Sequence, residues 1–196
     1  MSRRILPALG VIAASLVVAR REQPSSLDAV ATRVLSADRG AVIDRVAGAA
    51  TDVGSVFGMT GLAGILAAGG ERRLALRTYA AGSLAWAVAQ GTKELVDRRR
   101  PYEIGSAERL VSVPAGSSWP SGHASVAAAM AATLAPSLSP AGRMGAGGVA
   151  AMVAGTRLMV GVHHLTDVVA GAAIGVVAAD LTRILERATS QRSRRG

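Results

Sequence analysis

Charged residues are confined to short clusters, and long stretches of the chain carry none. No Asp, Glu, Lys or Arg occurs in residues 53–70, 78–92 or 110–142. A soluble amphipathic helix needs a polar face every turn or so, and these stretches supply no charged one. The pattern therefore favours helices that span a membrane over helices that pack around a soluble core.

Length is the main argument for the alternative, a soluble helical core. The first two uncharged stretches are shorter than the roughly 20 residues that the hydrocarbon core of a bilayer requires. Membrane helices in this chain must therefore extend into their charged flanks, where Arg side chains can reach the interface along their apolar stems.

We expect an all-α fold, a polytopic membrane helix bundle of about six transmembrane helices. The expected spans cover residues 5–19, 53–70, 74–95, 120–136, 141–162 and 165–185. Small residues let membrane helices approach closely. They recur along the second and sixth spans, as Gly54, Gly58, Gly61 and Gly64 and as Gly171 and Gly175. The first span follows a basic start, so a cleaved signal peptide is the alternative to a retained helix.

The stretch after the first span, residues 25–52, is amphipathic. One apolar face forms at helical spacing from Leu27, Val30, Ala31, Val34 and Leu35, and off it lie Asp28, Arg33 and Asp38. This pattern predicts an amphipathic helix or hairpin that lies in the membrane interface. A solvated loop with a helical bias is the alternative.

The chain is expected to divide into four segments. These are a first membrane helix or signal-like segment (1–24), the interfacial segment (25–52), a membrane helix bundle that carries all the motifs described below (53–188), and a basic cytoplasmic tail (189–196).

The net charge of +9 and the absence of cysteine narrow the possible functions. The basic residues lie in loops between apolar segments, and no basic helix with interleaved aromatic residues occurs, so we expect no nucleic-acid partner. Without cysteine the chain has no disulfides, thiolate metal sites or cysteine nucleophiles. Of its 22 basic residues, Lys93 is the single lysine, which draws attention to that position.

The order of the spans brings three polar motifs to one side of the membrane. The end of the third span, the start of the fourth and the junction of the fifth and sixth must lie on the same side. A cytoplasmic N-terminus makes that side the outside. The distribution of Arg and Lys favours this orientation only once Lys93, Arg100 and Arg157 are set apart as site residues.

The first motif is KELVDRRRP, residues 93–101. Lys93 and Arg100 are seven residues apart, which is two turns of a helix, so we expect them on one face. Two fixed cations can hold a phosphate and neutralise the charge of its transition state. The alternative is an ordinary basic cluster at a membrane boundary, which fits Arg98 and Arg99 better.

The second motif is SWPSGHAS, residues 118–125. Pro120 suits the first position of a helix, which would put Ser121, Gly122 and His123 in its first turn. Free backbone N–H groups there favour an anion, and a phosphate would also meet the Ser121 hydroxyl and the His123 ring. The alternative is a capped helix start with an incidental histidine.

The third motif is TRLMVGVHHLTD, residues 156–167. His163 and Asp167 are four apart and could hydrogen-bond on one helical turn. The carboxylate would fix the ring tautomer and leave the other nitrogen as a nucleophile. Arg157 is a charge within an expected membrane segment, where a charge is costly, so we treat it as a functional hypothesis. The alternative is an interfacial histidine pair with a helix-capping Asp.

A metal site is the competing chemistry, because three histidines and Asp167 could ligate zinc. His163 and His164 are adjacent and would point in two directions on a helix, so both cannot readily bind one ion. The cations Lys93, Arg100 and Arg157 would also repel a metal. We therefore expect no metal and no cofactor.

Together the three motifs resemble those of the type 2 phosphatidic-acid phosphatase superfamily, also called lipid phosphate phosphatases. That family shows K-x6-R-P, P-S-G-H and S-R-x5-H-x3-D. The chain matches these patterns at Lys93, Arg100, Pro101, Pro120, Ser121, Gly122, His123, Arg157, His163 and Asp167. It departs from them at Thr156, which replaces the Ser before Arg157 but keeps the hydroxyl.

The resemblance implies a multi-pass phosphatase of the cell (inner) membrane with an extracytoplasmic active site. His163, rather than His164, attacks phosphorus and forms a phosphohistidine, Asp167 orients it, and His123 serves as acid and then base. Phosphate-binding residues are Lys93, Arg100, Ser121, Gly122 and Arg157.

The expected partners are membrane lipids and a lipid phosphate substrate. Polyprenyl diphosphate or phosphate, phosphatidic acid and phosphatidylglycerophosphate are the candidates, and the oligomeric state stays open. A catalytically inactive scaffold or transporter that keeps a phosphate site is the alternative function. The superfamily also includes soluble vanadium haloperoxidases, against which the membrane spans and the short chain argue.

Overall fold

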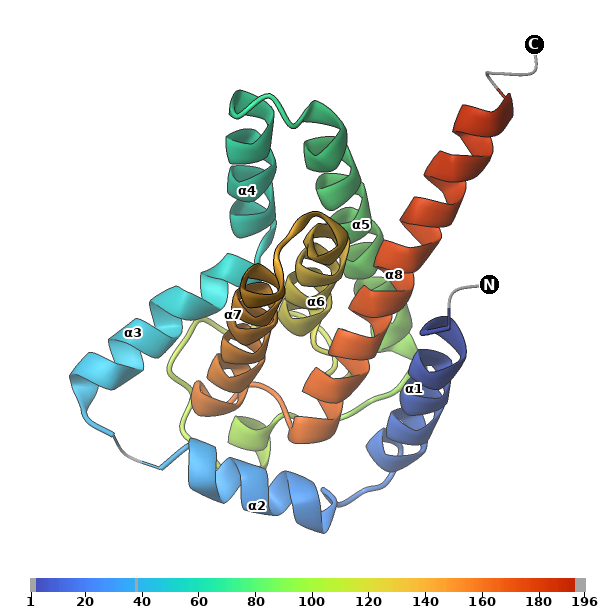
Figure 1. Cartoon of the computed structure of the whole chain (residues 1–196). Helices are drawn as coiled ribbons and strands as arrows, with labels where there is room; N and C mark the ends of the chain where they lie inside the picture. Colours follow the sequence, from blue (N-terminus) through green and yellow to red (C-terminus); the bar gives the residue numbers. More distant parts are fainter. Residues whose placement is uncertain (1–2, 38, 193–196) are drawn as a thin grey trace.

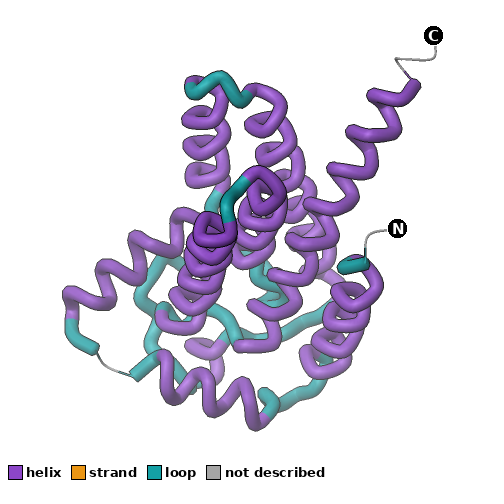
Figure 2. The backbone as a smooth tube through the Cα atoms, in the orientation of Figure 1, coloured by secondary structure: helices purple, strands orange, loops and turns teal. Residues whose placement is uncertain are grey.

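The computed structural model describes residues 3–37 and 39–192, and this part of the chain contains helices and no strand (Figure 2). Asp38 and most of the basic tail, residues 193–196, lie outside the described residues. The described residues form eight α-helices, which are α1 (Ile5–Ala19), α2 (Ser26–Leu35), α3 (Ala41–Thr51), α4 (Val56–Ala68), α5 (Arg72–Thr92), α6 (Gly122–Leu134), α7 (Pro140–Met159) and α8 (Leu165–Arg192). Four short 3-10 turns connect them, η1 (Asp52–Gly54), η2 (Lys93–Leu95), η3 (Pro101–Ile104) and η4 (Ala135–Ser137).

The all-α prediction is confirmed, and each expected span coincides with a helix, α1 and α4 to α8. By length and composition, one helix of the described chain can cross a membrane alone, Leu165–Gln191. The pair Ala41–Gly54 and Val56–Ala68, bent by 62°, makes a second candidate if it is one broken span. At 1.5 Å per residue, the 13-residue helices α4 and α6 are shorter than a bilayer core. The number of spans therefore stays a prediction.

Helix α6 lies at the centre of the bundle, packed against α5, α7 and α8, and α1 packs on α8 (Figure 1). The interface of α5, α6 and α8 is built from alanines. Its fully or almost fully buried members are Ala81, Ala85, Ala129, Ala178 and Ala179. Small side chains allow the helix backbones to come close. This is expected where van der Waals packing, and not the hydrophobic effect, drives the association of helices.

The glycines of the sixth expected span allow close helix packing, as predicted, whereas only some of those in the second span do. A Cβ atom at Gly171 would lie 2.3 Å from the carbonyl oxygen of Ser121, and one at Gly175 would lie 2.3 Å from that of Ser125. These two glycines therefore let α8 press against α6. Gly61 and Gly64 have no such neighbour within 4 Å, so the prediction of close packing is wrong for them.

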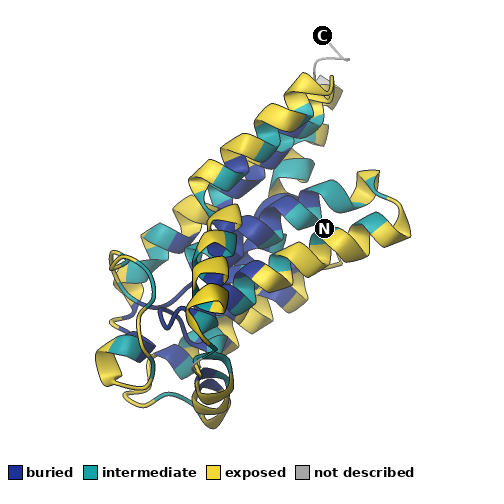
Figure 3. Ribbon diagram, turned by 90° about the vertical axis from the view of Figure 1, so that its left-hand side faces the viewer, coloured by how far each residue is buried: buried dark blue, intermediate teal, exposed yellow. Residues whose placement is uncertain are grey.

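Large apolar side chains lie mainly on the outside of the bundle. Phe57 is 87% exposed, Met144 78%, and Ile65 and Leu76 each 72%. Figure 3 shows that the outward surfaces of the long helices are largely exposed and that buried residues gather between them. Exposed apolar surface of this extent indicates contact with lipid or with other proteins.

Helix α2 lies across the lower end of the bundle in Figure 1. The burial of its side chains shows that part of its polar face is turned inward. Asp28 and Thr32 are buried, whereas Leu27, Val30 and Val34 are more than half exposed. The segment 25–52 is thus helical, as two helices, and not a solvated loop. The apolar face of α2 is exposed. Its contact with a membrane surface stays a prediction.

The three motifs come together at one end of the bundle, as the order of the spans predicts. Figure 1 shows the α5–α6 loop and the α7–α8 junction at the lower end, and the α4–α5 and α6–α7 connections at the upper end. Because the helices run alternately up and down, the end of α5, the start of α6 and the start of α8 share one level.

Candidate functional site

An open pocket of about 280 Å³ lies among η1, the start of α4, the ends of α5 and α7, and the start of α6. Six of the eight site residues expected from the sequence line it, and they are Lys93, Arg100, Gly122, His123, Arg157 and His163. The other two, Ser121 and Asp167, are fully buried and do not line the pocket. The structure therefore brings the two imidazole rings and the three cations to one cavity.

Lys93 and Arg100 reach the pocket from an irregular segment rather than from one helix face. Helix α5 ends at Thr92, and Val96 is extended, with φ −145° and ψ 119°. The prediction that two helical turns separate the cations is wrong, because α5 ends before Lys93 and only the short turn η2 follows it. Pro101 also disfavours helical backbone at Arg100. The backbone is extended at Val96 and at Arg100, and no helix forms between them.

The guanidinium of Arg100 is held by backbone carbonyl groups. Nη1 donates to Val162 O at 2.8 Å, and Nη2 lies 3.0 to 3.2 Å from the carbonyl oxygens of Ala115, Gly116 and Ser117. Only 1% of Arg100 is exposed. These contacts fix the position of the cation at the pocket wall and leave its positive charge without a carboxylate partner in the described chain.

Arg157 enters the pocket from the last turns of α7 and is likewise buried. Nη1 donates to the Thr51 hydroxyl at 2.8 Å, while Nε is buried and has no hydrogen-bond partner among the described residues. The hydroxyl of the preceding Thr156 donates to Val153 O within the helix. Thr156 therefore directs its hydroxyl into the helix.

The start of α6 presents Gly122 and His123 to the pocket. Ser121 is the N-cap, and its hydroxyl accepts the N–H of Ala124 at 3.4 Å. Pro120 thus precedes the cap, and its prediction as the first helical residue is wrong because Ser121 satisfies the helix end instead. The Trp119–Pro120 peptide bond is cis.

His163 lies in the loop before α8, so it and Asp167 do not share a helical turn as the sequence predicts. Nδ1 of His163 lies 3.7 Å from Asp167 Oδ2 and makes no hydrogen bond in the described structure. At this separation the carboxylate acts on the ring through its charge. Burial lowers the pKa of His163 to about 3, and Arg157 and Arg100 add to this effect against the opposing Asp167. The imidazole is therefore neutral at pH 7.

The two adjacent histidines point in different directions. His163 lines the pocket, whereas Nε2 of His164 lies 3.1 Å from Arg99 O, away from it. Within the described residues no group of three or more His, Asp or Glu side chains could hold a metal ion. The pocket instead gathers positive charge.

The model of one protein family matches residues 74–189, which hold all three motifs, and that family is the PAP2 superfamily. This chain belongs to the PAP2 superfamily. No curated sequence matches the chain significantly.

Two solved structures resemble the fold of this PAP2 chain. One is a transmembrane PAP2-type phosphatidylglycerolphosphate phosphatase from Bacillus subtilis, with a TM-score of 0.80 and 22% identity over 95% of this chain and 97% of that one. The other is LpxE from Aquifex aeolicus, with a TM-score of 0.70 and 20% identity over 77% of this chain and 91% of that one. At such identities the similarity establishes the fold.

Three residues next to the PAP2 pocket were not expected from the sequence. Arg98, which the sequence assigned to a boundary cluster, is buried and contacts both Asp167 and Asp28. The hydroxyl of Ser118 donates to Asp167 Oδ2 at 2.6 Å. Burial acts to raise the pKa of Asp28, but the Thr166 amide and Arg98 outweigh it and lower that pKa below its usual value.

A signal for Arg98 was present in the sequence. In an extended segment alternate side chains share a side. Val96, Arg98 and Arg100 are buried, whereas Asp97 and Arg99 are exposed. Reading residues 96–100 as extended, which Pro101 favours, would have placed Arg98 and Arg100 on the same side.

Proposed function

We propose that this protein is a metal-independent membrane phosphatase that hydrolyses a lipid phosphate or diphosphate through a phosphohistidine intermediate. One observation carries the proposal. Two imidazoles and three cations line a single pocket, and in the described chain none of these cations forms an ion pair with a carboxylate. Buried positive charge of this kind is costly unless an anion binds.

In the first step His163 attacks phosphorus. Its Nδ1 faces Asp167, so Nε2 is the nucleophile, and the carboxylate stabilises the positive charge that develops on the ring. Catalytic hydrogen bonds are often long before substrate binds, and we expect the 3.7 Å separation to shorten in the reacting complex. The P–O bond of the substrate breaks as the P–N bond forms, and His123 donates a proton to the leaving oxygen.

In the second step His123 removes a proton from water, which attacks phosphorus and breaks the P–N bond. Inorganic phosphate leaves and both imidazoles return to their starting forms. Two steps through a covalent intermediate suit this reaction, because direct hydrolysis of phosphate monoesters is extremely slow.

The phosphate oxygens are held by Lys93, Arg100 and Arg157, and by the free N–H groups at the start of α6, including that of Gly122. These donors are fixed before substrate arrives, which makes them effective at stabilising transition-state charge. Ser121 contributes its cap of α6, and its hydroxyl would have to turn from Ala124 to contact phosphate directly. The cations supply the electrostatic role that a metal has in other phosphatases.

The membrane location rests on the outward apolar surface of the long helices and on the uncharged stretches of the chain. We place residues 1–24 as a first membrane helix, 25–52 at the interface, and 53–188 as the catalytic bundle, with 189–196 in the cytoplasm and the pocket facing the extracytoplasmic side. Helix α2, with its exposed Leu27, Val30 and Val34, would lie at the surface of the outer leaflet. A lipid head group at that surface could enter the pocket.

The test is phosphate release from a panel of lipid phosphates by the full chain in detergent. The panel contains phosphatidylglycerophosphate, phosphatidic acid and polyprenyl phosphate and diphosphate. Phosphatidylglycerophosphate comes first because the similar Bacillus subtilis structure is that of a phosphatidylglycerolphosphate phosphatase. We expect activity on at least one lipid, no activity in His163→Ala, and no inhibition by EDTA. Strong inhibition by EDTA would overturn the metal-independent mechanism, and no release from any lipid would favour the inactive scaffold.

A further inference from the structure

A buried polar network lies behind the pocket and joins helix α2 to the residue that faces His163. Arg98 is at its centre, with 6% of its surface exposed. Its Nη2 donates to Asp28 Oδ2 at 2.7 Å, and its Nη1 donates to Asp167 Oδ1. Both carboxylates are completely buried. The planar fork of arginine suits this bridge, because it offers several donors in fixed directions.

The contact with Arg98 limits how Asp167 can turn. Arg98 occupies Oδ1 of Asp167, while Oδ2 accepts the Ser118 hydroxyl at 2.6 Å and the backbone N–H of His164 at 2.7 Å. Rotation of the carboxylate would break all three contacts. Oδ2 is therefore kept on the side of the His163 ring, which lies 3.7 Å away.

Asp28 fixes the other end of the bridge and also docks α2 on the start of α8. Its Oδ1 accepts the backbone N–H and the hydroxyl of Thr166 at 2.9 and 3.0 Å. Thr166 is the neighbour of Asp167 in the sequence, and its hydroxyl also contacts Arg98 at 2.6 Å. A negative charge at the N-terminus of α8 is favourable there. The position of α2 and the orientation of Asp167 thus depend on the same side chains.

We propose that Arg98 is a positioning residue that orients Asp167 toward His163, and that Asp28 holds Arg98 in place, so that docking of α2 is coupled to the chemical step. The inference rests on the phosphatase function proposed above. Arg98 and Asp28 do not line the pocket, so they act through Asp167 and not on the substrate. Their loss should lower kcat, because the cations that bind phosphate remain.

The first test is a double-mutant cycle with kcat and KM measured for Asp28→Asn, Arg98→Gln and the double variant. Small misplacements of a reacting group cost on the order of 10²-fold in rate, and we expect such a loss of kcat in Arg98→Gln with KM little changed. We expect kcat to fall roughly tenfold in Asp28→Asn, and we expect the kcat of the double variant to equal that of Arg98→Gln. Arg98→Lys should be intermediate, since a lysine reaches one carboxylate at a time.

Matched controls are Asp44→Asn on α3 and Arg99→Gln, whose side chain is exposed, and both should keep full activity. The proposal is overturned if the losses of Asp28→Asn and Arg98→Gln multiply in the double variant, if the loss falls on KM, or if the controls lose as much.

A second test does not depend on activity and uses the absence of cysteine from the chain. Thr32 on α2 is 4% exposed, and Thr32→Cys gives a single thiol whose labelling by a membrane-impermeant maleimide reports docking of α2. We expect slow labelling in this background, at least tenfold faster labelling when Asp28→Asn or Arg98→Gln is added, and no change with Asp44→Asn. Equal labelling rates in all these variants would overturn the docking role of Asp28, even if the protein is a phosphatase. If labelling is faster with Asp28→Asn or Arg98→Gln but the protein is inactive on every lipid, only the proposed phosphatase function is refuted.

Discussion

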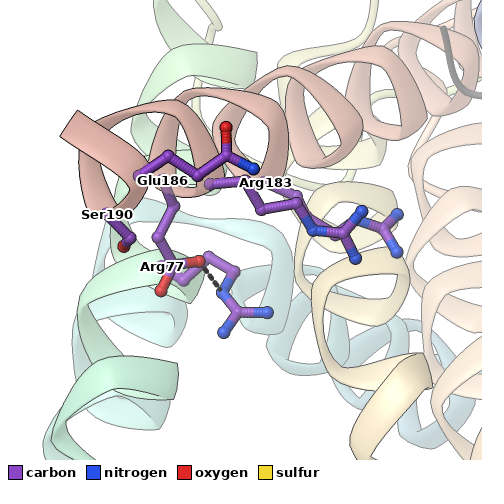
Figure 4. Close-up of a pocket in the computed structure, with 6 residues that line it drawn as sticks. Arg77, Arg183, Glu186 and Ser190 are labelled. Atoms are coloured by element: carbon purple, nitrogen blue, oxygen red, sulfur yellow. Dashed lines mark ion pairs between the residues drawn. The ribbon is translucent and has the colours of Figure 1, made fainter. Parts of the chain in front are cut away.

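The arginines that line the pocket and those at the opposite end of the helix bundle are in different circumstances. At the pocket end Arg100 and Arg157 are 1% and 4% exposed and form no ion pair in the described chain. At the other end, between α5 and the last turns of α8, Arg77 pairs with Glu186 at 2.8 Å, with side chains 24% and 36% exposed (Figure 4). That end also has an open pocket, lined by further arginines.

The difference shows which cluster of cations calls for a ligand. A partly exposed ion pair keeps part of its hydration and contributes little to stability, so the paired Arg77 needs no ligand to account for its charge. A buried cation that forms no ion pair is expensive, and the carbonyl groups around Arg100 meet only part of that cost. A pocket alone does not distinguish the two ends, but the burial and pairing of the charges do.

The largest effect is expected when the proposed nucleophile is removed and the cations of the pocket are kept. His163→Ala should lower turnover by about 10⁴-fold or more, because the proposed nucleophile is gone. Orthovanadate, an analogue of the phosphoryl group, should still raise the melting temperature of this variant in detergent, because all three cations remain. Full activity in the variant would refute the nucleophile assignment.

The next effect separates the roles of the two imidazoles. His123→Ala should lower the rate on lipid phosphates by about 10² to 10⁴-fold, the usual contribution of a general acid or base. The loss should be smaller for the first step with nitrophenyl phosphate, whose leaving group needs no proton, measured as the burst of nitrophenol. An equal loss on both substrates would argue against His123 as the acid.

A third experiment tests the comparison itself by removing one arginine from each end. Arg157→Gln should lower kcat/KM by about 10² to 10³-fold, since it removes a preorganised charge from the phosphate site. Arg77→Gln removes the same charge from the far end and should leave kcat/KM unchanged. Similar losses in both variants would show that the two clusters cannot be separated by burial and pairing.

The smallest effect concerns stability. Glu186→Gln breaks the partly exposed ion pair with Arg77 and should change the free energy of unfolding by no more than about 1 kcal/mol. Thermal unfolding in detergent with and without added salt measures this difference. A large destabilisation would mean that the far end depends on this ion pair, contrary to the small contribution expected of a partly exposed pair.

The sequence alone was enough to locate the helices and to bring the motifs together. Uncharged stretches located α1 and α4 to α8, because a charge is rarely tolerated on a helix buried in apolar surroundings. The alternation of helix direction then placed Lys93, His123 and His163 at one end. These conclusions needed only the period of the helix and the spacing of residues in three motifs.

The tertiary structure decided how each side chain is used. Arg98, Arg99 and Arg100 are identical in type and adjacent, and only the extended path of that segment puts the first and third inside and the second outside. Asp28 looked like a solvated residue on an amphipathic helix, yet the position of α2 across the bundle buries it against Arg98 and Thr166. Local pattern determines which segments are helical, whereas the partner of a buried charge depends on segments distant in sequence, and the chain must fold before they meet.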